Sequence, residues 1–300
     1  KIAEVGQNLR APGGTATVDG TGMYLMPGII DAHSHIATSS VNEATSPVTA
    51  EVQIEDVLDP YDIGIYRALA GGVTVSHILH GSANAIGGQS ETIKHRWGER
   101  DPEAIKMDGA PRTIKFALGE NPTRVHGRGY GVVPATRMGV EQVIRAAFAE
   151  ARLYDEAKTR AAKDANAAPP AYSLRMETMA DILRGDVIIH CHSYRADEIL
   201  MLIRLAEEMG FKIATFQHVL EGYKVAKEIA AHGAGASTFP PGFRRCWYSR
   251  KAVAAAPNRR RSKAVERRSD PQPSKMSWSS HIISDGTQDR IGANSGWLHR

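Results

Sequence analysis

The sequence predicts an α/β fold in which short strands and longer helices alternate around a parallel sheet. The chain has 300 residues, of which 42% are hydrophobic and 23% charged, enough to bury the core of one large domain. From about residue 26 to residue 239, short apolar runs alternate with longer segments of helical periodicity. The short runs are apolar on both faces, which is typical of buried parallel strands.

The expected elements follow in chain order. The expected strands are residues 29–35, 73–79, 113–118, 187–190, 213–217 and 234–239, with room for a seventh between residues 80 and 112. Apolar side chains at helical spacing predict amphipathic helices over residues 139–162 and 196–209, and Gly210 is the expected C-cap of the second. Two strand-like pieces, at residues 2–5 and 15–18, indicate the end of a small β domain.

Charge and composition divide the chain into three regions: residues 1–27, 28–242 and 243–300. Residues 243–300 hold 13 Lys and Arg against 4 Asp and Glu, a net charge of +9. Residues 1–242 hold the other 24 Lys and Arg and the other 29 Asp and Glu, a net charge of −5. Because the last region has few apolar residues and no helical or strand period, we expect it to be disordered or foreign to the domain before it.

Composition also excludes several classes of protein. No window approaches the roughly 20 apolar residues of a membrane span, and residues 1–6 lack the apolar run of a signal peptide. The two cysteines, Cys191 and Cys246, exclude a disulfide framework and a four-thiolate zinc site, and they leave the cellular compartment open. The cytoplasm is the default expectation.

Histidines end three of the expected strands, and this pattern indicates a metal site. His33 and His35 are two residues apart in one strand, so both imidazoles project to the same side. The runs that end at His190 and His218 bring further imidazoles to the same end of the sheet, where parallel barrels carry their active sites. Zinc and similar ions prefer such ligands.

Lys115 is unusual because it lies inside an expected buried strand, where an unpaired ammonium is costly. One interpretation is an edge position from which the side chain reaches water. The other is a lysine carboxylated by carbon dioxide, which would bridge two metal ions. Beside the four histidines the second interpretation is favoured.

Several segments resemble the amidohydrolase superfamily and, within it, the imidazolonepropionase-like branch. They are MPGIIDAHSH at residues 26–35, GGVTV at 71–75, GSANAIGGQ at 81–89 and IKFALGENP at 114–122. The resemblance extends from about residue 2 to residue 239. It implies a (β/α)8 TIM-type barrel over residues 28–242, incomplete here, with a remnant of a small β-sandwich domain in residues 1–27. Residues 81–89 are expected to form an active-site loop.

The resemblance also implies a metal-dependent hydrolase of C–N bonds in amide, cyclic amide or peptide-like substrates. His33 and His35 would bind one divalent ion, most simply zinc, carboxylated Lys115 would bridge, and His190 and His218 would bind a second. His190 is preferred to His192 because it ends the expected strand, and His192 is a candidate substrate contact. The expected partner is a small-molecule or short peptide-like substrate.

The sequence departs from the family at the end of the barrel. The family's eighth-strand aspartate has one weak candidate, Asp285, and the abrupt change at residue 240 suggests a frameshifted or truncated reading frame. The alternative function is therefore an inactive fragment. Nucleic-acid binding by residues 243–300 is a third hypothesis, disfavoured because the region shows no recognisable binding fold. Substrate identity and oligomeric state are left open.

Overall fold

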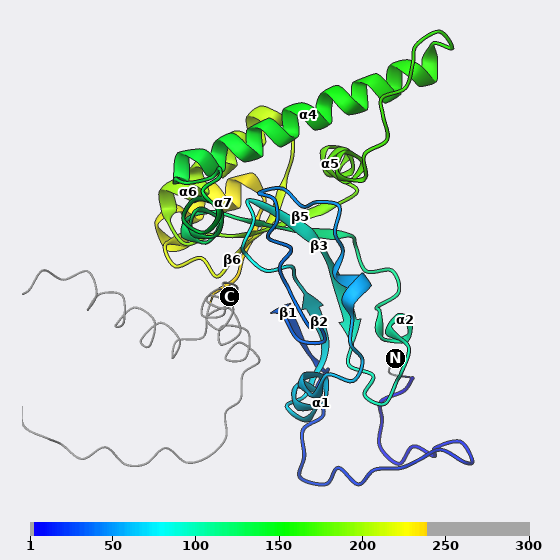
Figure 1. The fold of residues 1–300 in the computed structure, drawn as a ribbon. Coiled ribbons are helices and arrows are strands. Elements are labelled where there is room, and N and C mark those ends of the chain that lie inside the picture. Colours follow the sequence, from blue (N-terminus) through cyan, green and yellow to red (C-terminus); the bar gives the residue numbers. More distant parts are fainter. Residues whose placement is uncertain (1–2, 239–300) are drawn as a thin grey trace, which may run out of the picture.

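The computed structural model describes residues 3–238, which form an α/β half-barrel (Figure 1). Its sheet has seven strands in the order β1-β2-β3-β4-β5-β6-β7. The strands are β1 (Ile29–Ser34), β2 (Val73–Ile78), β3 (Ile86–Lys94), β4 (Thr113–Ala117), β5 (Ile188–His192), β6 (Ile213–Gln217) and β7 (Gly235–Ala236). The α-helices are α1 (Ile63–Ala70), α2 (Pro102–Ile105), α3 (Glu120–Pro122), α4 (Arg137–Lys163), α5 (Leu174–Arg184), α6 (Ala196–Met209) and α7 (Ala226–His232). The other helical segments are η1 (Ile54–Val57), η2 (Thr123–Tyr130) and η3 (Gly222–Val225).

The six expected strands and the two expected helices are present, with modest shifts at their ends. Helix α4 begins where the Thr136 side chain accepts a hydrogen bond from the Gly139 amide. Helix α6 ends, as predicted, at Gly210, whose φ of 79° is the left-handed conformation that glycine adopts easily. The short helices α1, α5 and α7 were not predicted.

The seventh strand, β3, does lie between residues 80 and 112, but the expectation of a wholly parallel sheet is wrong. Strand β3 is antiparallel to both of its neighbours, whereas β1 pairs with β2, and β4 to β7 pair in sequence, as parallel strands. Only residues 79–85 join β2 to β3, which is too short a connection for a parallel crossover. Residues 86–89, expected in a loop, are therefore the start of a strand.

Two hydrophobic cores fill the two ends of the sheet. The larger core packs β4, β5 and β6 against α4, α5, α6 and α7, which lie together in Figure 1. In it the rings of Phe148 and Phe211 stack with centroids 4.0 Å apart. The smaller core includes Ile65 of α1, Ile78 of β2 and Ile93 of β3. Strand β3 contributes to both cores, so it joins them.

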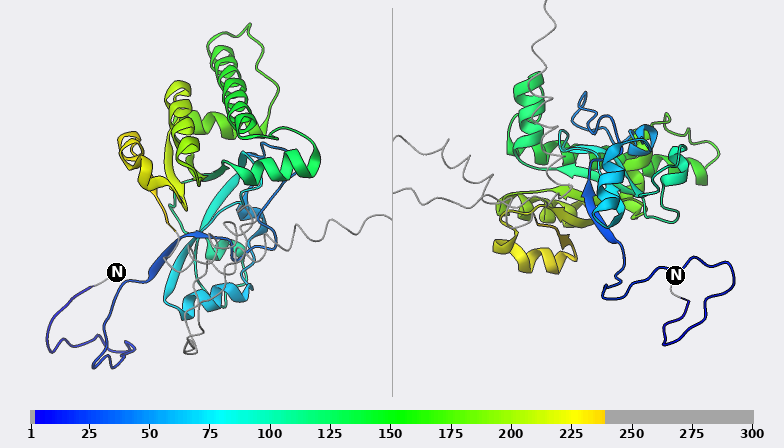
Figure 2. Two further views of the ribbon diagram at one scale, coloured as in Figure 1. Left: turned by 90° about the vertical axis from the view of Figure 1, so that its left-hand side faces the viewer. Right: turned by 90° about the horizontal axis from the view of Figure 1, so that it is seen from below.

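Residues 3–28 form neither helix nor strand. They extend away from the sheet (Figure 2), and Val5 and Val18 are 86% and 91% exposed. The piece expected at residues 15–18 is therefore not a strand, and the β-sandwich remnant is not observed. Residues 243–300, which include Asp285 and the region of the nucleic-acid-binding hypothesis, lie outside the described residues.

None of the helices within residues 3–238 combines the length and apolar composition that crossing a membrane requires.

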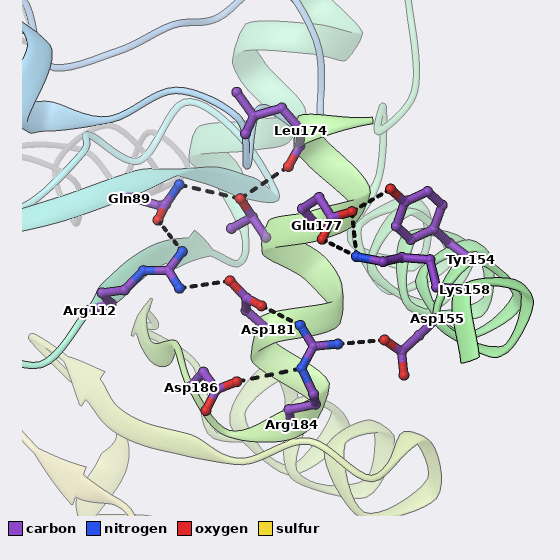
Figure 3. Close-up of polar contacts among 11 residues, drawn as sticks. Gln89, Arg112, Tyr154, Asp155, Lys158, Leu174, Glu177, Asp181, Arg184 and Asp186 are labelled. Atoms are coloured by element: carbon purple, nitrogen blue, oxygen red, sulfur yellow. Dashed lines mark hydrogen bonds and ion pairs between the residues drawn. The ribbon is translucent and has the colours of Figure 1, made fainter. Parts of the chain in front are cut away.

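A polar network stabilises the end of the sheet at which β4 and β5 begin (Figure 3). Arg112, just before β4, donates to Gln89 of β3 at 3.1 Å and to Asp181 of α5 at 2.7 Å. Asp181 also pairs with Arg184. In barrel folds, residues at this end of the sheet commonly stabilise the fold, whereas catalytic residues lie at the opposite end. The paired side chains of this network agree with a stabilising role.

Replacing Asp181 by asparagine is expected to lower the free energy of unfolding by about 1 kcal/mol, because Arg112 loses its ion pair with Asp181, whereas Arg184 keeps its pair with Asp155. The matched control is Asp186→Asn. Asp186 lies 3.5 Å from Arg184 and its side chain is 62% exposed, so its replacement should change stability by less than about 0.5 kcal/mol. Urea denaturation of both variants provides the measurement, and equal effects would contradict the assigned role of Asp181.

Candidate active site

The chemically distinctive side chains gather where β1, β4, β5 and β6 end. These strands all run in the same direction, because the single inverted strand, β3, lies between β2 and β4. Register places Lys115 of β4 beside His190 of β5, and His192 of β5 beside Gln217 of β6. Alternation along β5 then directs His190 and His192 to the same side of the sheet.

His33 and His35 direct their Nε2 atoms toward one point. The Nδ1 atom of His35 lies 2.8 Å from the Leu79 carbonyl oxygen, and Nδ1 of His33 lies 3.0 Å from Gln217 Oε1. Because those oxygens only accept hydrogen bonds, the protons belong on both Nδ1 atoms, and both Nε2 atoms present lone pairs. The two Nε2 atoms are 3.3 Å apart. Two nitrogens bound about 2.0–2.1 Å from one tetrahedral ion are separated by about the same distance.

Lys115 is completely buried, and its Nζ atom has no hydrogen-bond partner among residues 3–238. The edge-position interpretation, in which the ammonium reaches water, is therefore wrong, because β4 lies between β3 and β5. Burial lowers the pKa of Lys115 to about 7. Lys115 in turn lowers the pKa values of His33 and His190 electrostatically. These effects indicate that the amine lies among the histidines.

His33 and His190 are neutral at neutral pH, because burial lowers the pKa of each. Burial is the largest cause of the fall in the pKa of His190 to about 3, and nearby His77 and Lys115 add to it. Burial likewise lowers the pKa of His33 well below its usual value, with contributions from Lys115 and His218. Neutral imidazoles carry the lone pairs that metal coordination requires.

Gln217 is a positioning residue that the sequence analysis missed. Its side-chain amide contacts His33 Nδ1 through Oε1 and His190 Nδ1 through Nε2, each at 3.0 Å. The Ser237 hydroxyl, just after β7, donates to the same Oε1 at 2.7 Å. The only sequence signal was its place beside His218 at a strand end, since a neutral amide has no distinctive spacing pattern.

His218 has a φ of 43°, an unusual left-handed conformation for a residue with a side chain. Its backbone amide donates to the Ser237 hydroxyl at 2.9 Å, and its ring lies 4.9 Å from the His33 ring between centroids. Strained backbone persists only where surrounding contacts support it, and it is common at functional sites. The strained conformation brings the His218 ring against the His33 ring at the end of β6.

The structure places His192, rather than His190, against His218. The centroids of the His192 and His218 rings are 4.4 Å apart, and Tyr194 lies 4.4 Å from His192. Asn121, after β4, approaches His192 with its Nδ2 atom 3.4 Å from Nε2. His190 instead packs against His77, with a centroid separation of 4.6 Å. Both histidines are thus near the cluster, with different neighbours.

The other histidines of residues 3–238 are all buried. His77 and His80 are hydrogen-bonded to Thr113 and to the Glu43 amide. His95, His126 and His232 lie just after β3, in η2 and at the end of α7, positions where a histidine is commonly solvated, yet each is at most 7% exposed. Their burial depends on packing between segments distant in sequence, which local composition does not reveal. Within residues 3–238, no three His, Cys, Asp or Glu side chains already adopt metal-binding geometry.

His80 should make stability depend on pH. It accepts a hydrogen bond from the Glu43 amide at 2.9 Å, and burial lowers its pKa to about 4 from 6.5. Between these two values the unfolded state binds a proton that the folded state does not, so acidification destabilises the fold. The contribution of His80 is expected to be about 2 kcal/mol at pH 5. In His80→Gln the loss of stability between pH 7 and pH 5, measured by denaturation, should be smaller by about that amount. An unchanged pH dependence would contradict this assignment.

Comparison with known proteins agrees with the fold and the motifs. No protein-family model matches the sequence. Amidohydrolase tasK of Hapsidospora irregularis is 35% identical over 231 residues, which cover 69% of this chain and 23% of tasK. The crystal structure of an amidohydrolase from Thermotoga maritima MSB8 is 40% identical, with a TM-score of 0.72, over 79% of this chain and 62% of that one. The chain thus spans only part of each relative. On these similarities, the chain belongs to the amidohydrolase superfamily.

Proposed function

We propose that the chain is a metal-dependent hydrolase of C–N bonds in amide, cyclic amide or peptide-like substrates. The observation that carries the proposal is the pair of Nε2 atoms of His33 and His35, 3.3 Å apart. Both atoms present lone pairs, because the Nδ1 atoms face acceptor oxygens. Two lone pairs at this separation repel unless a proton or a cation lies between them, and the low pKa of His33 disfavours the proton.

Lys115 supports the proposal because its surroundings suit carboxylation. The neutral amine attacks the carbon of carbon dioxide, forms an N–C bond and releases one proton, which leaves a carbamate with one negative charge. A pKa of about 7 keeps much of the amine neutral near neutral pH. The carbamate would supply the anionic oxygens that the neutral histidines lack.

The ligand assignment follows the strands. His33 and His35 would hold one ion, carboxylated Lys115 would bridge, and His218 with His190 or His192 would hold the second. Bound divalent ions would supply an activated water and polarise the substrate carbonyl. The chain's own residues orient these groups: the Leu79 carbonyl and Gln217 fix the rings of His35 and His33, with distances of 2.8 and 3.0 Å. Tyr194 and Asn121, which lie beside His192, would contact the substrate.

The second candidate is the inactive fragment. It is favoured by one observation of the sequence: beyond residue 239 the family's eighth-strand aspartate has one weak candidate, Asp285. Such a chain would bind metal through the same ligands but turn over no substrate.

Elemental analysis and a hydrolysis screen test the proposal on the full chain. Zinc or manganese is supplied during purification, bound metal is measured after size exclusion, and an amide and dipeptide panel is screened. About two ions per chain together with hydrolysis would support the enzyme. Bound metal without hydrolysis would favour the fragment, and a folded chain without metal would contradict both. His190→Ala and His192→Ala then form a matched pair, of which the true ligand's variant should lose metal.

A further inference from the structure

An arginine-lined cavity of about 600 Å³ lies beside the candidate active site. Segment η2 and the beginning of α4 form most of its wall, and Arg124, Arg128 and Arg137 line it. All three side chains are on exposed residues. The cavity is therefore open to solvent and large enough for part of a small molecule.

The cavity carries unneutralised positive charge. Arg137 pairs with Glu198, which is only 5% exposed. Arg124 and Arg128 form no ion pair with any residue in the described range 3–238. Glu120 is the one acidic residue in the lining. Two guanidinium groups with no described partner in one concave surface present a forked array of donors suited to a carboxylate or a phosphate.

The cavity and the histidine cluster share one loop. Glu120 lines the cavity, and the next residue, Asn121, approaches His192 Nε2 at 3.4 Å. The Thr123 hydroxyl donates to the carbonyl oxygens of Gly119 and Glu120 at 3.1 and 3.0 Å, which fixes this turn. The loop that lines the cavity thus also contacts His192, one of the proposed metal ligands.

We propose that Arg124 and Arg128 bind an anionic group of the substrate, so that the enzyme prefers amides carrying a carboxylate or phosphate away from the scissile bond. This inference rests on the proposed function, because only a hydrolase would have a substrate whose anionic group the arginines could bind. The anion site itself depends only on the cavity and its arginines. The positive end of the long helix α4, which begins at Arg137, adds to the attraction for an anion.

The first experiment measures anion binding without any turnover. The full chain is titrated with succinate and, separately, with inorganic phosphate at constant ionic strength, by isothermal titration calorimetry. The double variant Arg124→Gln/Arg128→Gln should weaken the binding of the preferred anion by at least about tenfold. The control is Arg160→Gln, which removes an exposed arginine of α4 far along the helix from the cavity. Circular dichroism checks that each variant is folded.

The outcomes separate the anion site from the proposed chemistry. A response to succinate alone assigns a carboxylate, and a response to phosphate alone assigns a phosphate ester. The variant His33→Ala/His35→Ala should bind the anion as the wild type does, since the arginines are independent of the metal ligands. Absence of binding, or binding that survives Arg124→Gln/Arg128→Gln, overturns the proposal.

The second experiment compares an N-acyl amino acid with its carboxamide. Wild-type kcat/KM should favour the carboxylate by about tenfold or more, and Arg124→Gln/Arg128→Gln should remove the preference. Hydrolysis without any charge preference, together with no anion binding, would overturn the inference and leave the proposed function intact. Anion binding through the arginines with no hydrolysis of any substrate would support the anion site and contradict the proposed function.

Discussion

Replacing Lys115 by methionine is expected to abolish hydrolysis and, at the same time, to stabilise the metal-free protein. The methionine cannot form the bridging carbamate, so turnover should fall by at least about a thousandfold. Yet Lys115 is fully buried, with no hydrogen-bond partner for Nζ among residues 3–238. An apolar side chain of similar length removes that cost, and the gain at pH 7 should be about 4 kcal/mol.

The pH dependence of stability distinguishes this explanation from general damage. Burial lowers the pKa of Lys115 from 10.5 to about 7, so between these values the unfolded state holds a proton that the folded state has lost. Wild-type stability should therefore rise as pH increases from 7 to 10, and Lys115→Met should lack most of this rise. Denaturation in chelator and CO2-free buffer makes the comparison. A destabilised variant with the wild-type pH profile would contradict the buried-amine interpretation.

The second large effect is expected for His33→Ala/His35→Ala. Removing both imidazoles deletes the pair of Nε2 atoms, so the metal at that position should be lost and hydrolysis should fall by at least about a thousandfold. Elemental analysis after size exclusion measures the metal directly. The fold should persist, because the residues adjoining this pair that pack in the smaller core, Ile36 and Ala37, are unchanged.

His95→Gln is the matched control for that double variant. His95 is also a buried histidine near the smaller core, but it contacts the Val73 carbonyl oxygen and the Ser76 hydroxyl at 2.9 and 2.8 Å, away from the cluster. It should keep its metal. Metal retained by His33→Ala/His35→Ala, or lost equally from His95→Gln, would show that the ion binds elsewhere.

The common direction of the strands explains why the convergence of these histidines could be predicted from sequence. His33, His35, His190 and His218 lie at or near the ends of strands that run in one direction, so their convergence follows from the topology alone. The inversion of β3 could not be anticipated from its composition, because strand direction depends on connection length and not on apolar pattern. The shortness of the connection at residues 79–85 reveals the direction of β3 only when the ends of both strands are known.

Side chains that contact the histidines only because of the strand register were harder to predict from sequence. Gln217 acts through its position opposite His192 and its reach to His33 and His190, and a one-residue shift of β6 would direct it to the other face. Gly87 shows the same dependence on packing. A Cβ there would lie 2.6 Å from His80 Nδ1, so the glycine permits β3 to pass close to that ring.

The bridging position of β3 has a consequence for how the molecule unfolds. His35 adjoins the smaller core, whereas Lys115 and His190 belong to strands of the larger one and His218 directly follows β6. Strand β3 contributes to both cores. If the proposed ligands bind metal, they come from both cores, and metal binding would then couple the unfolding of the two units. Native-state hydrogen exchange should then show two separate opening reactions without metal and a single shared one with it, since neither unit can open in the bound state without releasing the ion.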